Sequence, residues 1–233
     1  MKTRQDLSME IKMTINELKD EIGTRKVLFV IPCCKHKKMK NSALPGGVNP
    51  AAGIHSHLDA STDHDFICAR RKVLPMATSV SPGFLQVFDR YDGTLYNVPG
   101  VRDLLVRHSP HTIYIMSALY GLLATSDWIQ NYELKMNAKD VTPSWRSVLP
   151  ATITQCSLSL GVDVIVGLFG ETTAYAKVFK SLGAKAGCDV YAVHTIAGRS
   201  QKKISQGLGH GLLFLAEGMP VPDSFIFSVK KVR

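Results

Sequence analysis

The chain has 233 residues, of which 45% are hydrophobic and 20% charged, so it can bury one folded core and a disordered chain is excluded. Its net charge of +9 favours acidic partners, with nucleic acids and nucleotides first. No apolar run approaches the roughly 20 residues that a membrane-spanning helix needs, and the five cysteines lack the paired spacings of a disulfide framework.

Two elements are predicted near the start of the chain. Apolar residues spaced by three and four predict an amphipathic helix over residues 6–22, which Gly23 ends. Charged residues are interleaved through the first part of the chain, which lacks the apolar stretch of a signal peptide, so we expect the protein in the cytoplasm. The continuous apolar run of residues 27–31, stopped by Pro32, predicts a fully buried parallel strand.

A long irregular loop is predicted over about residues 33–65, where Gly, Pro, Asn, Ser, His and Lys occur without a period. Short helices are then predicted over residues 66–76, 84–89 and 98–108, the last with Pro99 in its first turn. These helices would form the first crossover of a parallel sheet.

Strands and helices alternate through the second half of the chain. Buried strands are predicted over residues 112–116, 164–168 and 189–193. Helices are predicted over residues 144–160, 172–182 and 200–217, and a short tail from Met219 onward. This alternation predicts an α/β fold within a single domain of residues 1–233: an open, mostly parallel sheet of about four or more strands, flanked by helices in three layers.

The residues that follow each predicted strand form the candidate site, because ligands of open α/β sheets bind outside the carboxyl ends of the strands. After the first strand come Cys33, a candidate catalytic thiol, and three candidate binding residues, Cys34, Lys35 and Lys37. Lysines attract phosphate and lower the pKa of a neighbouring cysteine, so this loop is the leading anion site. A solvated basic loop with incidental thiols is the alternative.

Two further loops contribute candidates. Glu171 and Thr172 follow the third strand, where Glu171 could act as a general acid or base or hold a ribose hydroxyl. An ordinary acid at a helix start is the alternative for Glu171. Arg199 follows the fourth strand, and it could bind phosphate together with polar residues at the start of the last helix, although a solvated helical turn explains them as well. Those polar residues are Gln201, Lys202 and Lys203.

The irregular stretch after the second strand carries aromatic residues, which are Trp128, Tyr132 and Trp145, with Asn131 and Glu133 among them. Aromatic side chains there could stack on a nucleobase, while packing of the loop onto the sheet is the alternative, favoured for Trp145. The cysteines and histidines near the start of the chain lack the spacing of a zinc finger, and no Gly-rich phosphate fingerprint occurs. We therefore expect neither a metal nor a cofactor.

Residues 115–123, Ile-Met-Ser-Ala-Leu-Tyr-Gly-Leu-Leu, resemble the Ser-Ala-x-Tyr-Gly-Leu segment of the YaaA-like superfamily, the peroxide-stress proteins and their bacterial and phage relatives. The run from Cys33 to Lys37 is similar to that family's strand-terminal Cys-x-x-x-Lys, and Leu95-Tyr96 to its Leu-Tyr. Residues 129–134 stand where the family has a Pro-Tyr-Asp element, with Asn131 and Glu133 in place of the Pro and the Asp. The first motif also resembles, more weakly, the strand end of the archaeosine-synthase accessory domain, whose fold is likened to uracil-DNA glycosylases.

The YaaA-like resemblance implies a nucleic-acid-associated α/β protein, linked in the family to DNA protection under oxidative stress, with base or nucleotide processing in relatives. It also implies which residues line the site: Cys33, Lys37, Ser117, Tyr120, Gly121 and Tyr132.

Three functions remain open at this stage. In the first, the protein is an enzyme acting at a nucleobase or N-glycosidic bond, where lysines hold phosphate, Tyr120 or Tyr132 stacks the base, and Glu171 or Glu133 polarises water. In the second, it binds DNA or RNA without turnover, for which the basic charge suffices. In the third, Cys33 and Cys34 form a thiol redox or iron-linked sensor.

Overall fold

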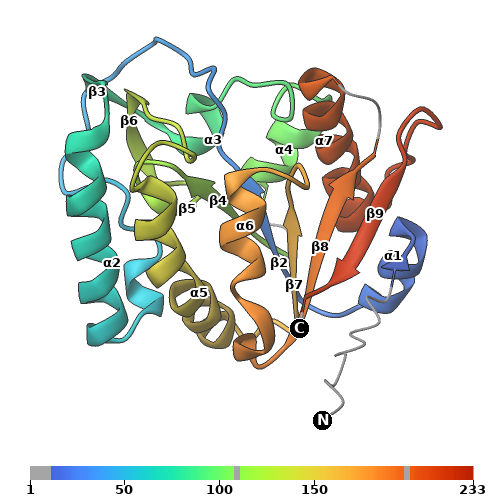
Figure 1. The fold of residues 1–233 in the computed structure, drawn as a ribbon. Coiled ribbons are helices and arrows are strands. Elements are labelled where there is room, and N and C mark those ends of the chain that lie inside the picture. The colour runs from blue at the N-terminus through green and yellow to red at the C-terminus, as the bar shows by residue number, and fades with distance from the viewer. Residues whose placement is uncertain (1–11, 108–110, 197–199, 233) are drawn as a thin grey trace.

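The computed structural model describes residues 12–107, 111–196 and 200–232. Its strands form a seven-stranded sheet, in the order β1-β9-β8-β7-β2-β4-β5, and a separate two-stranded ribbon of β3 and β6 (Figure 1). The strands are β1 (Lys12–Met13), β2 (Val27–Pro32), β3 (Ser79–Gln86), β4 (Thr112–Ser117), β5 (Gly121–Ala124), β6 (Trp128–Glu133), β7 (Val164–Leu168), β8 (Asp189–Thr195) and β9 (Phe227–Lys231).

The four central strands, β4, β2, β7 and β8, run parallel to one another. Nearly all of their residues are buried, because helices cover both faces and leave no solvent side on which polar residues would alternate. These are the four strands predicted from the apolar runs, and each extends by at most two residues beyond its predicted range.

Helices cover the sheet on both faces, which confirms the predicted three-layer α/β fold (Figure 1). On one face α2 packs against α5, and α5 against α6; on the other, α7 packs against α1 and α4. The helices are α1 (Ile15–Ile22), α2 (Ala60–Val73), α3 (Val87–Arg90), α4 (Val101–Val106), α5 (Val141–Leu160), α6 (Ala174–Lys180) and α7 (Gln201–Glu217), with 3₁₀ turns at His55–His57, Leu74–Met76 and Gly183–Ala186. Within the described ranges, no helix has the length and hydropathy needed to cross a membrane.

The N-terminal helix is shorter than the predicted range of residues 6–22. Thr14 caps α1, where its hydroxyl accepts a hydrogen bond from the Glu17 backbone N–H at 3.2 Å and Glu17 Oε2 accepts one from the Thr14 N–H at 2.5 Å. This reciprocal capping box starts the helix at Ile15, and Lys12–Met13 pair with β9 as an edge strand instead. The remainder of the predicted helix, residues 6–11, lies outside the described residues.

The segment predicted as a loop over residues 33–65 ends earlier than expected, since Asp59 caps α2 and the helix begins at Ala60. The helix predicted over residues 84–89 is wrong in its first half, because residues 84–86 complete β3 and pair with β6. Only the single turn of α3 follows. The prediction failed because the pairing partner of this strand lies some forty residues further along the chain, beyond the reach of a local pattern.

Antiparallel strands extend the sheet at both edges. β5 pairs with β4 at one edge, and β9 pairs with β8 at the other. The predicted C-terminal tail is therefore wrong: Phe227–Lys231 form β9, which β8 and β1 flank. β9 ends in two lysines, so its hydropathy does not give the apolar run that predicts a buried strand.

Candidate functional site

The candidate site is a cleft at the carboxyl ends of β2 and β7. The chain passes from β2 to β4 on one side of the sheet and later returns to β7 on the other side of β2. At such a reversal the loops leaving the two neighbouring strands turn toward opposite faces and open a crevice between them. Here that crevice is a cleft of about 840 Å³. The carboxyl ends of the central strands lie at the upper side of Figure 1.

Loops from four parts of the chain line the cleft. The loop after β2 contributes Cys33, Cys34, Lys35 and Lys37. The end of β6, the loop after it and the start of α5 contribute Glu133, Leu134, Lys135, Met136, Asn137 and Thr142. The segment after β7 and the start of α7 contribute Thr172, Thr173, Ala174, Tyr175, Lys177 and Gln201.

The charge of the cleft is strongly positive. Four lysines line it, Lys35, Lys37, Lys135 and Lys177, against one carboxylate, Glu133. Within the described part of the chain, none of these lysines forms an ion pair, so their charges are left to attract a ligand.

Lys37 is held in place by an aromatic ring. Its Nζ lies 4.2 Å from the centroid of the Tyr132 ring and 3.4 Å from the carbonyl oxygen of Lys35. A cation over a ring face is attracted by the quadrupole of the ring. Tyr132 therefore positions the ammonium group of Lys37 and does not contact a ligand directly. The Tyr132 side chain is only 1% exposed.

A chain of hydroxyl groups lies beneath the cleft. Tyr175 Oη and Cys33 Sγ are 3.0 Å apart, and Tyr132 Oη donates to Cys33 Sγ at 3.4 Å. Tyr132 Oη also lies 2.8 Å from Ser117 Oγ and 3.0 Å from Tyr91 Oη. Burial raises the pKa of Tyr132 and of Tyr175 well above the ordinary value, so both phenols are neutral donors at physiological pH.

The pKa of Cys34 shifts in the direction opposite to the one that the neighbouring lysines predict. Burial raises the pKa of the Cys34 thiol to about 12, and the nearby charge of Cys33 adds to the rise. Lys37 and the Gly93 N–H, which donates to Cys34 Sγ at 3.2 Å, act in the lowering direction but more weakly. The expectation that lysines lower the pKa of this cysteine is therefore wrong, because desolvation outweighs charge here.

The motif that carries the YaaA-like resemblance builds a turn and does not line the cleft. Ser117 and Gly121 pair at the end of the β4–β5 hairpin, and Ser117 Oγ accepts a hydrogen bond from the Tyr120 N–H at 3.0 Å. Gly121 has a positive φ of 81°, and a Cβ there would lie 2.6 Å from the Trp145 ring. Arg70 donates to the Tyr120 carbonyl oxygen at 3.0 and 3.2 Å. Ser117 reaches the site only through Tyr132.

The other aromatic and polar candidates, on β6 and α5, divide between packing and surface. Trp145 is fully buried and donates from its indole nitrogen to the Ala118 carbonyl oxygen at 2.7 Å, as the packing interpretation predicts. The Asn131 amide lies 3.1 Å from the sulfur of Met39 and is not among the residues lining the cleft. Glu133, at the end of the strand, does line it.

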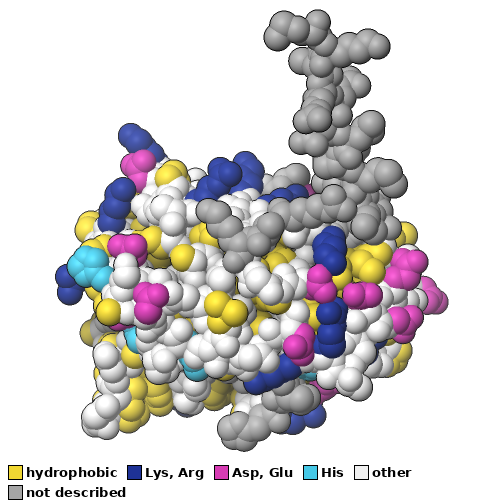
Figure 2. Space-filling model, turned by 90° about the horizontal axis from the view of Figure 1, so that it is seen from below, with side chains coloured by type: hydrophobic (Ala, Val, Ile, Leu, Met, Phe, Trp, Pro, Cys, Tyr) yellow, Lys and Arg dark blue, Asp and Glu magenta, His cyan; other side chains and the backbone are white. Residues whose placement is uncertain are grey.

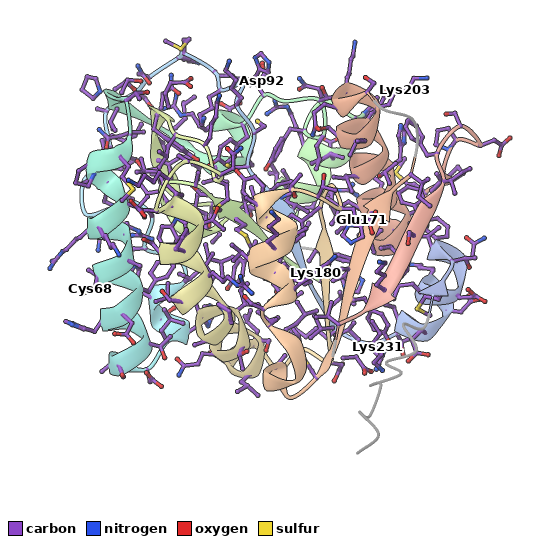
Figure 3. The ribbon with its side chains drawn as sticks, viewed as in Figure 1. Cys68, Asp92, Glu171, Lys180, Lys203 and Lys231 are labelled. Carbon is purple, nitrogen blue, oxygen red and sulfur yellow. The ribbon has the colours of Figure 1, made fainter. Side chains whose placement is uncertain are left out.

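Glu171 is turned away from the cleft. Its carboxylate forms an ion pair with Lys230 of β9 at 3.2 Å, which lowers the pKa of Glu171. Figure 3 shows the residue over the upper part of β8, on the side of β9. The other candidate of this loop, Thr172, does line the cleft. Arg199 lies outside the described residues.

Sequence reasoning missed several residues of the cleft. Tyr175 and Lys177 lie within the first turns of α6, and a helical pattern does not indicate which of its residues line a cleft. Lys135 follows β6, a strand that was not predicted. It also missed Arg90, which is fully buried and fastens the loop after β2 to the ribbon. The Arg90 guanidinium donates to the carbonyl oxygens of Lys38, Lys40, Gly83 and Ile129 and to Asn41 Oδ1.

The cysteines and histidines of residues 33–68 are dispersed. His55 pairs with Asp63, His57 with Ser159, and Cys68 with His64. Within the described ranges, no group of three or more His, Cys, Asp or Glu side chains is arranged to hold a metal ion.

Comparison with known proteins adds no further assignment. No protein-family model matches the sequence, and no curated protein matches it. The YaaA-like resemblance therefore rests on its motif residues alone, and function has to be argued from the cleft.

Proposed function

We propose that the cleft binds the phosphate of a nucleotide or of a nucleic-acid strand and that the protein hydrolyses an N-glycosidic bond of that ligand. The observation that carries the proposal is the charge of the cleft: four lysines without ion-pair partners face a single carboxylate at the switch point of the sheet. Lysine ammonium groups are strong donors to phosphate oxygens.

Tyr175 is the residue that offers a base a stacking surface. It is the one aromatic side chain among the described residues lining the cleft, and its ring lies parallel to that of Phe169, with an interplanar angle of 2° and 6.2 Å between centroids. The earlier candidates fit this role less well, since Tyr132 is buried beneath Lys37 and the Tyr120 hydroxyl accepts a hydrogen bond from the Gln130 N–H. Base–aromatic stacking tolerates any base.

Glu133 is the residue proposed to act on the bond. Its carboxylate accepts a proton from a water molecule while the water oxygen bonds to C1′ of the sugar. The C1′–N bond breaks, and the base leaves with the bonding electron pair and takes up a proton from solvent. The lysines hold the phosphate and so fix the sugar relative to Glu133.

The binding step is tested with Lys177→Ala. We expect this variant to bind a 5′-mononucleotide about tenfold more weakly, the loss of roughly 1.4 kcal/mol of a charge-assisted contact, by titration calorimetry at low salt. Lys180→Ala is the matched control, because Lys180 is exposed on the same helix and does not line the cleft. Equal affinity of the two variants and the parent would contradict the assignment of the cleft.

The chemical step is tested with Glu133→Gln. The parent protein is incubated with nucleotides, single- and double-stranded DNA, and RNA, and free base is measured by mass spectrometry. We expect release by the parent to fall at least about a hundredfold in Glu133→Gln while binding is retained, since general acid–base groups contribute on that order.

A second function, nucleic-acid binding without turnover, is favoured by the exposure of Glu133, which lacks the buried setting that usually tunes a catalytic carboxylate. Salt-sensitive binding without any released base from the parent would establish this function and remove the hydrolase.

A further inference from the structure

A second, smaller cleft of about 500 Å³ adjoins the first. The two share a wall that includes Cys33, Cys34, Lys35, Thr173, Tyr175 and Gln201. Beyond this wall, the second cleft is lined by Gly93 and Thr94 on one side and by Lys202 and Ser205 of α7 on the other.

The second cleft is also positive. Lys35 and Lys202 line it, and its described lining contains no carboxylate. The two acids adjacent in sequence to lining residues, Asp92 and Glu171, are engaged elsewhere. Asp92 pairs with Arg102 at 2.7 Å, and Glu171 pairs with Lys230 at 3.2 Å. Lys202 is exposed and has no ion-pair partner among the described side chains.

From their shared wall, the two clefts extend toward different helices. Lys177 of the first comes from α6 and Lys202 of the second from α7, and these helices cover opposite faces (Figure 1). The shared wall, with Lys35 in it, is built from the residues that leave the end of β2 and from the starts of α6 and α7. Together the clefts form one groove at the carboxyl end of the sheet, with Lys177 in one cleft, Lys202 in the other and Lys35 in the wall that they share.

Each cleft has the size of a site for one small ligand, since such sites range over about 300–1,000 Å³. A mononucleotide therefore fills only one of them and leaves the cations of the other without a partner. A ligand with two phosphates in series, each attached to its own sugar, matches the division of the cations between two adjoining compartments.

We propose that the groove binds two consecutive nucleotides of a single strand, one in each cleft, so that the substrate class is an oligonucleotide or strand end and not a free mononucleotide. This inference rests on the proposed function and specifies its ligand. The unit in the larger cleft lies beside Glu133 and Tyr175, and the neighbouring phosphate is held by Lys202.

The experiment compares 5′-phosphorylated mononucleotides and dinucleotides, of both the deoxyribose and ribose series, in binding to the parent, Lys202→Ala and Lys203→Ala. Lys203 is the matched control, because it is the next residue of α7, is exposed, and does not line either cleft; Figure 3 shows it at the upper end of that helix. Circular dichroism verifies that each variant is folded.

We expect the parent to bind the dinucleotide at least about tenfold more tightly than the mononucleotide, the equivalent of one added charged contact. Lys202→Ala should remove that advantage, because the dinucleotide loses far more affinity than the mononucleotide. It should also reduce the slope of log affinity against log salt for the dinucleotide by about 0.7, the value for one phosphate contact on a single strand.

Equal affinities of the parent for the two ligands would overturn the inference, as would a loss in Lys202→Ala that is the same for both. Either result leaves the proposed function in place, because a mononucleotide still binds. Failure of every ligand to bind the parent would overturn the proposed function and this inference with it.

Discussion

Single residues in and around the cleft show how burial competes with charge. Lys35 and Lys37 closely follow Cys34 in sequence, yet the loss of hydration on burial raises the pKa of the Cys34 thiol to about 12. Glu171 shows the reverse case, since it remains exposed and Lys230 lowers the pKa of its carboxyl. Cys34 is therefore not set up for a redox role, and Glu171 is not set up for an acid–base role, although their positions in the sequence suggest these roles.

The raised pKa of Cys34 predicts slow alkylation. At pH 8 a thiol with a pKa of about 12 is ionised in about one molecule in ten thousand, and only the thiolate reacts. With iodoacetamide and mass-spectrometric mapping, we expect Cys34 to be modified only after unfolding in urea. Cys68, which is exposed on α2, is the control and should react first. Modification of both at the same rate would restore the redox-sensor hypothesis.

The elements of the fold depend on a few side chains that set their boundaries. Thr14 and Glu17 begin α1, Asp59 begins α2 and Thr173 begins α6, and in each case a side-chain oxygen accepts a backbone N–H of the first turn. The cap of α6 also matters for the site, because Thr173 lines both clefts. Helix boundaries therefore determine which residues face the ligand.

Removal of the α1 cap tests this dependence away from the site. Thr14→Ala should lower the free energy of unfolding by about 1 kcal/mol, because the Glu17 N–H loses its partner. Urea denaturation followed by circular dichroism measures the change, and Thr14→Ser should restore most of it. Unchanged stability in Thr14→Ala would show that α1 is held only by its packing against α7 and β9.

The charge of the whole molecule is unevenly arranged. At the amino ends of the strands, positive and negative side chains lie close together (Figure 2), and Arg25 and Lys231 both pair with Asp189. At the carboxyl ends, the lysines of the cleft have no such partners among the described residues. Part of the net charge of +9 therefore stands without ion-pair partners where the topology of the sheet already favours a ligand.

The buried phenols predict a loss of stability at alkaline pH for the molecule as a whole. Burial raises the pKa of Tyr91, Tyr96, Tyr132 and Tyr175 above the value of about 10 in an unfolded chain. The unfolded state therefore loses protons first, so this contribution is fully present below about pH 10 and declines as the pH rises further. Cys34 acts in the same direction from a lower pH.

Urea denaturation between about pH 8 and about pH 11 measures this decline. We expect the free energy of unfolding to fall over this range, and to fall less steeply in Tyr91→Phe, which lacks one of the ionising groups. A flat profile in the parent protein would show that the phenols ionise as readily in the folded state as in the unfolded one.

By itself the sequence determined the four central strands, the helices α5, α6 and α7, and the end of the sheet where the cleft lies. Continuous apolar runs and helical spacing are local signals, and the rule that ligands meet the carboxyl ends of parallel strands needs only the order of the elements. Seven predicted residues line the larger cleft: Cys33, Cys34, Lys35, Lys37, Glu133, Thr172 and Gln201.

Only the tertiary structure decided the rest. Whether a strand pairs at an edge, as β9 does, depends on a partner far away in the chain. The convergence of Lys135 and Lys177 on one cleft, the ion pair that turns Glu171 away, and the burial that keeps Cys34 protonated likewise depend on contacts between distant segments. Long-range strand pairing and desolvation cannot be predicted from local sequence patterns, because they arise only when distant segments of the chain pack together.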